Sequence, residues 1–215
     1  GEKSGWAGKP GGGFHKTVTT NREVKMDTNR INLSDFQQLL TRKNLLPIQI
    51  VQLGITSGTS AFFIIVLVLT RTPPVGQMPD PSFLNILSLA HLGLAIAVYT
   101  AAHVVYRFIV NPKRLAGSMY LANQPDHAAI AEKCLSLIRT GTILRFAFLE
   151  GVAFFGLILC LMAGQNGLLE AHPEYWLNVF SYFVLLLVTL ATFATRDRLE
   201  NLFINRFLNA FLYRE

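Results

Sequence analysis

The chain has 215 residues, of which 51% are hydrophobic and only 15% are charged. A soluble globular domain usually carries about 25% charged residues. The charges are also unevenly placed, because residues 1–45 hold eight of the 19 Lys and Arg residues and residues 47–70 hold none. This composition excludes a disordered chain, argues against an ordinary soluble enzyme and indicates an integral membrane protein.

Four segments are long and apolar enough to cross a bilayer, which requires about 20 apolar residues. They are predicted at residues 47–70, 83–106, 143–164 and 176–195. Proline-rich sequence separates the first two, and a segment containing Gly and Pro separates the last two, so each pair is predicted to form a hairpin. The longer link between the hairpins is expected to contain a short helix over residues 125–138.

The predicted fold class is therefore all-α, with four transmembrane helices in two tandem hairpins and amphipathic helices at both ends. The predicted parts are a basic N-terminal extension with an amphipathic helix (1–45), a first hairpin (46–110), a cytoplasmic link (111–142), a second hairpin (143–196) and a C-terminal amphipathic helix (197–215).

The distribution of basic residues predicts the orientation of the spans, because Lys and Arg collect in cytoplasmic loops. The loop of residues 71–82 has only Arg71, the loop of residues 165–175 has none, and the link of residues 107–142 has five. Both termini and the link are therefore predicted to face the cytoplasm. The collection of Lys and Arg on the cytoplasmic side accounts for the net charge of +6, so this charge does not indicate nucleic-acid binding.

Amphipathic sequence flanks the predicted bundle. Before the first span, Ser34 is followed three residues later by Gln37, which is the pattern of a helix capping box. After the fourth span, apolar residues such as Leu199, Leu202 and Phe203 follow the spacing of one helix face. This C-terminal segment is expected either to lie on the cytoplasmic membrane surface or to extend the fourth span and pack on a partner subunit.

Two short matches indicate an internal repeat. Ala61-Phe-Phe in the first span matches Ala153-Phe-Phe in the third, and Leu84-Asn-x-x-Ser in the second matches Leu177-Asn-x-x-Ser in the fourth. The two offsets are 92 and 93 residues. They favour a duplicated two-helix hairpin whose copies are related by an axis along the membrane normal.

Polar residues are predicted to form one layer in the cytoplasmic third of the membrane. Glu150 is its centre, because a carboxylate in a spanning helix costs about 2.5–3.5 kcal/mol unless it is paired, protonated or hydrated. At about 1.5 Å per residue, Glu150 lies roughly 10 Å inside the predicted cytoplasmic end of its span. The predicted members are Gln49, Gln52, His103, Arg107, Arg145, Glu150 and Arg196.

This layer has two interpretations. One is a proton or ion site, and the other is a buried Glu–Arg or Glu–His pair that fixes the register of the helices. The structural interpretation is favoured, because the apolar spans hold one carboxylate and no polar stripe reaches the outer face.

No metal or haem site is predicted in the chain. The two cysteines lack a CxxC or zinc spacing, and His91 and His103 share one span without a histidine in another. His91 is instead expected to bond to residues 56–60. Bound lipid is the only small molecule expected, and a pigment or haem is expected only in a neighbouring subunit.

Small residues predict where helices approach closely. Gly54 and Gly58 form a small-xxx-small face on the first span, and Gly151 and Gly156 are expected to serve the same purpose on the third. Tyr175 and Trp176, at the start of the fourth span, are predicted to be anchors at the membrane interface.

Two motifs resemble those of a family of small bacterial four-helix inner-membrane proteins of uncharacterised function. They are Arg145-Phe-Ala-x-Leu-Glu150-Gly-x-Ala153-Phe-Phe and Thr195-Arg196-x-Arg198. The resemblance covers the second half of the chain best and implies a location in the bacterial inner membrane, with no activity. Glu-Gly-x-Ala is also weakly similar to the rotor-ring proteolipids of ATP synthases. There, however, the carboxylate lies on the second helix of a hairpin, and this chain lacks their dense glycine repeat.

The predicted function is that of a non-catalytic subunit in a larger membrane complex, with lipid and other membrane-protein subunits as partners and no nucleic acid. Motifs for phosphate binding, nucleophilic catalysis, zinc proteolysis and dinucleotide binding are missing from the sequence. The alternative is a small ion or proton conductor that uses Glu150 with His103 or Arg107.

Overall fold

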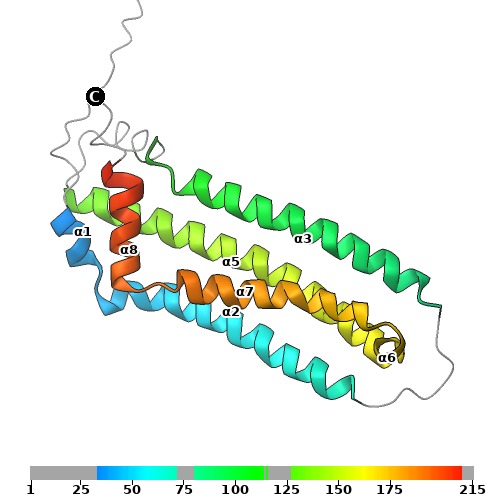
Figure 1. Ribbon diagram of the computed structural model, residues 1–215. Helices are drawn as coiled ribbons and strands as arrows, with labels where there is room; N and C mark the ends of the chain where they lie inside the picture. Colours follow the sequence, from blue (N-terminus) through cyan, green and yellow to red (C-terminus); the bar gives the residue numbers. More distant parts are fainter. Residues whose placement is uncertain (1–32, 72–79, 114, 116–126, 210–215) are drawn as a thin grey trace, which may run out of the picture.

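The computed structural model of the protein describes residues 33–71, 80–113, 115 and 127–209 (Figure 1). Outside the described residues lie the predicted basic extension up to residue 32, residues 72–79 of the first loop, residues 114 and 116–126 of the link, and residues 210–215. Every element of the described part is a helix.

Four helical segments in the described part are long and apolar enough to cross a membrane. They are α2 (Arg42–Leu69), α3 (Ser82–Ile109), α5 (His127–Gln165) and the segment Pro173–Thr192, which consists of the 3₁₀ helix η2 (Pro173–Val179) and α7 (Phe180–Thr192). The helices α2 and α3 have 28 residues each, so each is longer than a hydrocarbon core of about 30 Å. The prediction of an all-α, multi-pass membrane protein with four candidate spans is confirmed.

The third span is longer than the sequence predicted. The expectation of a separate short helix over residues 125–138 is wrong, because α5 is continuous over 39 residues, which makes it about 58 Å long. Gly141 lies within it, and a β-carbon there would be 3.0 Å from Val110 Cγ2 and 3.2 Å from Tyr106 Cδ2. The end of α3 packs closely against this glycine. This contact stabilises the helical conformation of α5 at the point where the sequence predicted that the link ends and the third span begins.

The fourth span is irregular at both ends. After α6 (Leu168–Ala171) the chain turns back through η2, and Gly167 before α6 has a φ of 71°, which glycine adopts without strain. At the other end α7 stops at Thr192, and Phe193 and Thr195 have extended backbone before α8 (Arg196–Phe203) begins. The C-terminal segment therefore does not extend the fourth span.

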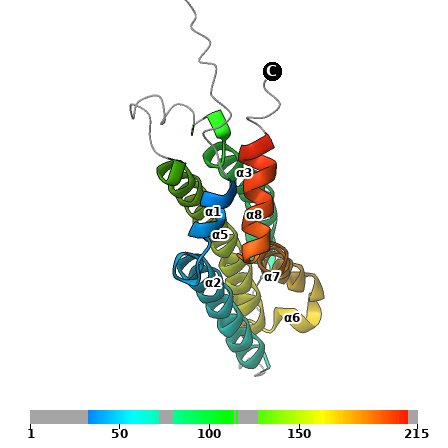
Figure 2. The same cartoon turned by 90° about the vertical axis from the view of Figure 1, so that its left-hand side faces the viewer.

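Helix α5 lies at the centre of the bundle, against α3, α2 and α7. Figures 1 and 2 show α2 and α3 on different sides of α5. Consecutive spans run in opposite directions, as two hairpins require, so α2 and α5 are parallel (Figure 1). However, α2 and α3 do not form one of the main helix–helix contacts, so the predicted first hairpin is held together through α5.

The helix α1 (Leu33–Leu39) and α8 close one end of the bundle, here called the α8 end; the opposite end is the α6 end. Phe36 stacks on Phe203 with ring centroids 4.1 Å apart, and both side chains are fully buried. The side chain of Gln37, predicted as part of a capping box, donates a hydrogen bond of 2.5 Å to Glu200. The apolar faces of the two amphipathic segments thus cover each other and α5.

Large apolar side chains cover the outside of α2, α3 and α7. Leu89, Leu177 and Leu190, for example, are 72%, 75% and 71% exposed. Such an extended apolar surface is rare on a soluble monomer. It is the surface that a helix bundle presents to lipid chains.

Candidate functional site

Two members of the predicted polar layer, Gln49 and Gln52, bind the backbone where α7 ends. Gln52 is fully buried. Its amide nitrogen donates to the Thr192 carbonyl at 3.1 Å, and its amide oxygen accepts from the Ala194 N–H at 2.9 Å. Gln49 donates to the Ala194 carbonyl at 2.8 Å. The glutamines therefore satisfy backbone groups that the extended connection between α7 and α8 leaves without helical partners.

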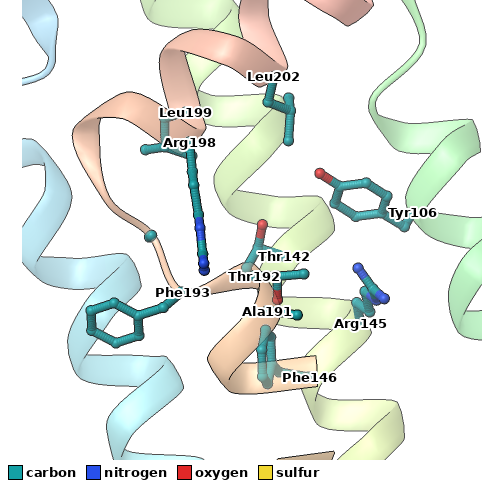
Figure 3. Close-up of a pocket in the computed structure, with 11 residues that line it drawn as sticks. Tyr106, Thr142, Arg145, Phe146, Ala191, Thr192, Phe193, Arg198, Leu199 and Leu202 are labelled. Atoms are coloured by element: carbon teal, nitrogen blue, oxygen red, sulfur yellow. The ribbon is translucent and has the colours of Figure 1, made fainter. Parts of the chain in front are cut away.

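Arg145, a third member of the layer, lines a pocket of about 250 Å³ beside the same break (Figure 3). Its guanidinium group lies over the Tyr106 ring, 5.6 Å from the centroid, which is a cation–π geometry. Arg198 lines the pocket from α8, and its Nη1 donates to the Leu190 carbonyl at 2.8 Å. The pocket thus lies between α3, α5, α7 and α8.

The other four members of the predicted layer are not brought together. His103 and Arg107 are exposed on α3, and Arg196 is exposed at the start of α8. Glu150 is half-buried on α5. Within the described residues the expected Glu–Arg or Glu–His pair is not formed, since the salt bridge found there joins His172 to Glu174.

Glu150 lies on the flank of α5 that faces α2. Phe154, one turn further along α5, contacts Phe62 of α2 with ring centroids 5.3 Å apart. Because α2 and α5 are parallel (Figure 1), Glu150 lies one turn before this contact, level with Gly58. A β-carbon at Gly58 would meet no atom within 4 Å. Glu150 is thus one helical turn from a contact with α2, at about the level of a part of α2 that no described residue covers.

Of the four predicted packing glycines, Gly156 makes a close contact within the chain. A β-carbon there would overlap the Asn178 carbonyl oxygen and lie 2.8 Å from His91 Cε1. At Gly54, Gly58 and Gly151 a β-carbon would meet no atom of the described residues within 4 Å. Their role in helix packing stays a prediction that concerns another chain.

Glycine spacing gave no indication of two further close contacts. At Gly164 a β-carbon would overlap the side chain of Thr70, at the end of α2. At Gly141 it would crowd Val110 and Tyr106. Neither glycine is part of a small-xxx-small pattern in the sequence, so only the folded arrangement shows their use.

A buried hydrogen-bond network around His91 joins α3, α5 and the fourth span toward the α6 end. His91 Nδ1 lies 2.9 Å from Asn178 Oδ1, and Nε2 lies 3.1 Å from Ser181 Oγ and 3.2 Å from the Val152 carbonyl. His91, Asn178 and Ser181 are at most 5% exposed. Nδ1 faces an amide oxygen and Nε2 faces a backbone carbonyl, so each ring nitrogen has an acceptor to which it can donate, and Nε2 can alternatively accept from the Ser181 hydroxyl.

The network extends to the segments that carry the repeated motif. Asn178 Nδ2 donates to Ser88 Oγ at 3.0 Å, and the Tyr175 hydroxyl donates to Asn85 Oδ1 at 2.7 Å. Asn85 and Ser88 belong to the motif of the second span, and Asn178 and Ser181 to that of the fourth. The motif thus marked the two segments that bond to each other. Tyr175 is 1% exposed, so its predicted role as an interfacial anchor is wrong.

The expected bond between His91 and residues 56–60 is also absent. That stretch of α2 pairs with α7 instead: the hydroxyl groups of Thr56 and Thr189 are 2.9 Å apart, and the Tyr182 hydroxyl donates to Ser60 at 3.0 Å. Hydroxyl pairs of this kind hold membrane helices together where lipid offers no polar partner.

Together these contacts bind helices to one another. Among the described residues of the apolar spans, they leave the Glu150 carboxyl group without a hydrogen bond or ion pair, and a pocket lined by two arginines lies beside the α7–α8 break. In the part of the chain that the structure describes, no group of three or more His, Cys, Asp or Glu residues could hold a metal ion. No family model, curated protein or solved structure matches the chain.

Proposed function

We propose that the protein is a non-catalytic integral membrane subunit that packs against another subunit of a larger bacterial inner-membrane complex. The observation that supports this proposal most is the uncovered face of α2, together with Glu150 on the neighbouring α5, whose carboxyl group has no ion pair among the described residues. Gly54, Ser57 and Gly58 are exposed on this face, and Glu150 lies level with it. The absence of side chains at the two glycines would let a partner helix approach the α2 backbone closely.

The energetics of Glu150 support a partner at this face. An unpaired carboxylate in a spanning helix costs about 2.5–3.5 kcal/mol on insertion scales. Ser57 does not reduce this cost, because its hydroxyl donates to the Gly54 carbonyl of its own helix at 3.2 Å. A hydrogen-bond donor or a cation on the partner helix would stabilise Glu150 and fix the register of the interface.

Purification of the tagged full-length protein from native membranes in mild detergent tests this function, with mass spectrometry of the proteins that co-elute. We expect the wild type to retain a membrane partner, Gly58→Leu to lose it and Glu150→Gln to weaken its retention. Gly93→Leu is the matched control, because Gly93 is an exposed glycine on α3 with no atom within 4 Å of its β-carbon position.

Retention of the partner by Gly58→Leu would contradict the proposal. Ion flux in proteoliposomes tests the rival conductor function with the same variants. If Glu150→Gln abolished flux and left the assembly intact, the conductor would replace the subunit.

The distribution of charge supports the proposed orientation, in which the α8 end faces the cytoplasm. Described basic residues at this end include Arg42, Lys43, Lys113, Lys133, Arg139, Arg196, Arg198 and Arg206. The described residues of the α6 end include Arg71 and three acidic side chains, Asp80, Glu170 and Glu174. By the positive-inside rule this asymmetry supports an orientation with both termini in the cytoplasm. A C-terminal alkaline phosphatase fusion should be inactive, and an active fusion would reverse the orientation.

A further inference from the structure

The pocket beside the α7–α8 break contains two guanidinium groups, and none of its lining residues is acidic. Arg145 enters from α5 and Arg198 from α8. Figure 3 shows the two guanidinium groups on opposite sides of Thr192. Neither arginine forms an ion pair with a carboxylate of the described residues. Two cations that share a pocket without a counter-charge favour the binding of an anion.

The two arginines keep hydrogen-bonding capacity for such an anion. Arg198 uses Nη1 for the Leu190 carbonyl, and the guanidinium group of Arg145 lies over the face of the Tyr106 ring. Guanidinium groups carry five N–H donors in a planar fork that matches the oxygens of a phosphate. The Tyr106 hydroxyl points toward the pocket in Figure 3, and Thr142 also lines it, so both can contribute further donors.

The surroundings of the pocket indicate that the anion has an apolar part. Arg145 lies near the α8 end of the apolar segment of α5, at the level expected for lipid headgroups. Leu190, whose carbonyl binds Arg198, has a side chain that is 71% exposed, and Phe108 on α3 is 57% exposed. In a bilayer acyl chains cover both side chains.

We propose that this pocket binds the phosphate group of an anionic phospholipid, with its acyl chains along the neighbouring apolar surfaces of α3 and α7. The inference does not rest on the proposed subunit function, since it concerns the opposite flank of α5. A bound lipid would join α8 to α3, α5 and α7 at the point where the fourth span is broken.

The proposal is tested by thermal unfolding of the delipidated full-length protein in detergent. Phosphatidylglycerol, phosphatidylcholine and inorganic phosphate are titrated separately. We expect phosphatidylglycerol to raise the midpoint and the other two to leave it unchanged at the same concentration. Arg145→Gln and Arg198→Gln should each weaken the apparent affinity for phosphatidylglycerol at least about tenfold, as expected for the loss of a charge-assisted hydrogen bond.

Matched controls are Arg107→Gln on α3 and Arg196→Gln on α8, which remove exposed arginines outside the pocket. Both should bind phosphatidylglycerol as the wild type does. Equal shifts with phosphatidylcholine, equal losses in the controls, or an equal shift with inorganic phosphate alone would each overturn the proposal, the last by showing a site for a free anion. If Arg145→Gln fails to fold, as judged by circular dichroism without lipid, the variant Arg198→Gln still tests the proposal, because Arg198 is exposed.

Discussion

The side chain of Gln52 provides the hydrogen-bond acceptor that the backbone N–H of Ala194 would have found in a continuous helix. Its amide oxygen accepts the Ala194 N–H at 2.9 Å, while its amide nitrogen donates to the Thr192 carbonyl at 3.1 Å. The two residues are 142 positions apart in the chain. A single buried side chain of α2 therefore makes the break between α7 and α8 tolerable in apolar surroundings, where unpaired backbone groups are costly.

Replacing this glutamine should destabilise the whole bundle. Gln52→Leu leaves the Ala194 N–H and the Thr192 carbonyl unpaired, so we expect the free energy of unfolding to fall by about 1–3 kcal/mol. Reversible unfolding in mixed micelles, followed by circular dichroism, measures the change. Ser57→Ala is the control, because Ser57 is exposed and bonds within its own helix. Equal stability of the two variants would show that water or detergent satisfies the break.

The two glycines predicted for packing on α5 should respond in opposite ways to alanine. In Gly156→Ala the added methyl group overlaps the Asn178 carbonyl and crowds the His91 ring, so we expect a loss of about 1–3 kcal/mol, as for other overpacked sites. In Gly151→Ala the methyl group meets no atom within 4 Å, so stability should stay the same or rise by up to about 1 kcal/mol from helix propensity. The same unfolding measurement on both variants shows whether the loss of stability comes from the close contact at Gly156 or from replacing any glycine of α5. Similar losses in the two variants would contradict the described geometry.

The spans could be predicted because a bilayer requires long apolar runs, and the chain has four. The end of the fourth span could not be predicted from its neighbours. Residues 193–195 contain no Gly or Pro, and the group that permits the break, Gln52, belongs to another helix. Likewise, α5 continues through Gly141 because α3 packs on it, a contact that periodicity along one helix does not reveal.

The candidate site was harder to predict, because depth in the membrane does not decide which helices are neighbours. The sequence-based estimate of depth predicted that Glu150 lies near His103 and Arg107. In the structure, however, the side chains of His103 and Arg107 are exposed on α3. The repeated motifs, which were interpreted as a duplication, also marked residues and segments that contact each other in the structure. Two matched phenylalanines, Phe62 and Phe154, contact each other, as do the segments that carry the matched Asn and Ser residues.

The aromatic stack at the α8 end should contribute strongly to stability. Phe36→Ala removes a fully buried ring that stacks on Phe203, so the free energy of unfolding should fall by about 3–5 kcal/mol. Limited proteolysis should also cleave α8 faster, because its apolar face loses its cover. Phe83→Ala serves as the control, since Phe83 on α3 is 62% exposed and should leave the proteolysis of α8 unchanged. Equal cleavage of both variants would show that α8 does not depend on α1.

A double-mutant cycle between His91 and Asn178 should reveal the energetic coupling of the buried network. His91→Leu and Asn178→Leu each leave the other side chain with an unpaired polar atom, whereas the double variant removes both atoms. We therefore expect the double variant to be more stable than the sum of the single changes predicts, by about 0.5–3 kcal/mol. His103→Leu is the control, because this exposed histidine on the same helix should change stability by less than about 0.5 kcal/mol. Additive losses would contradict the network as described.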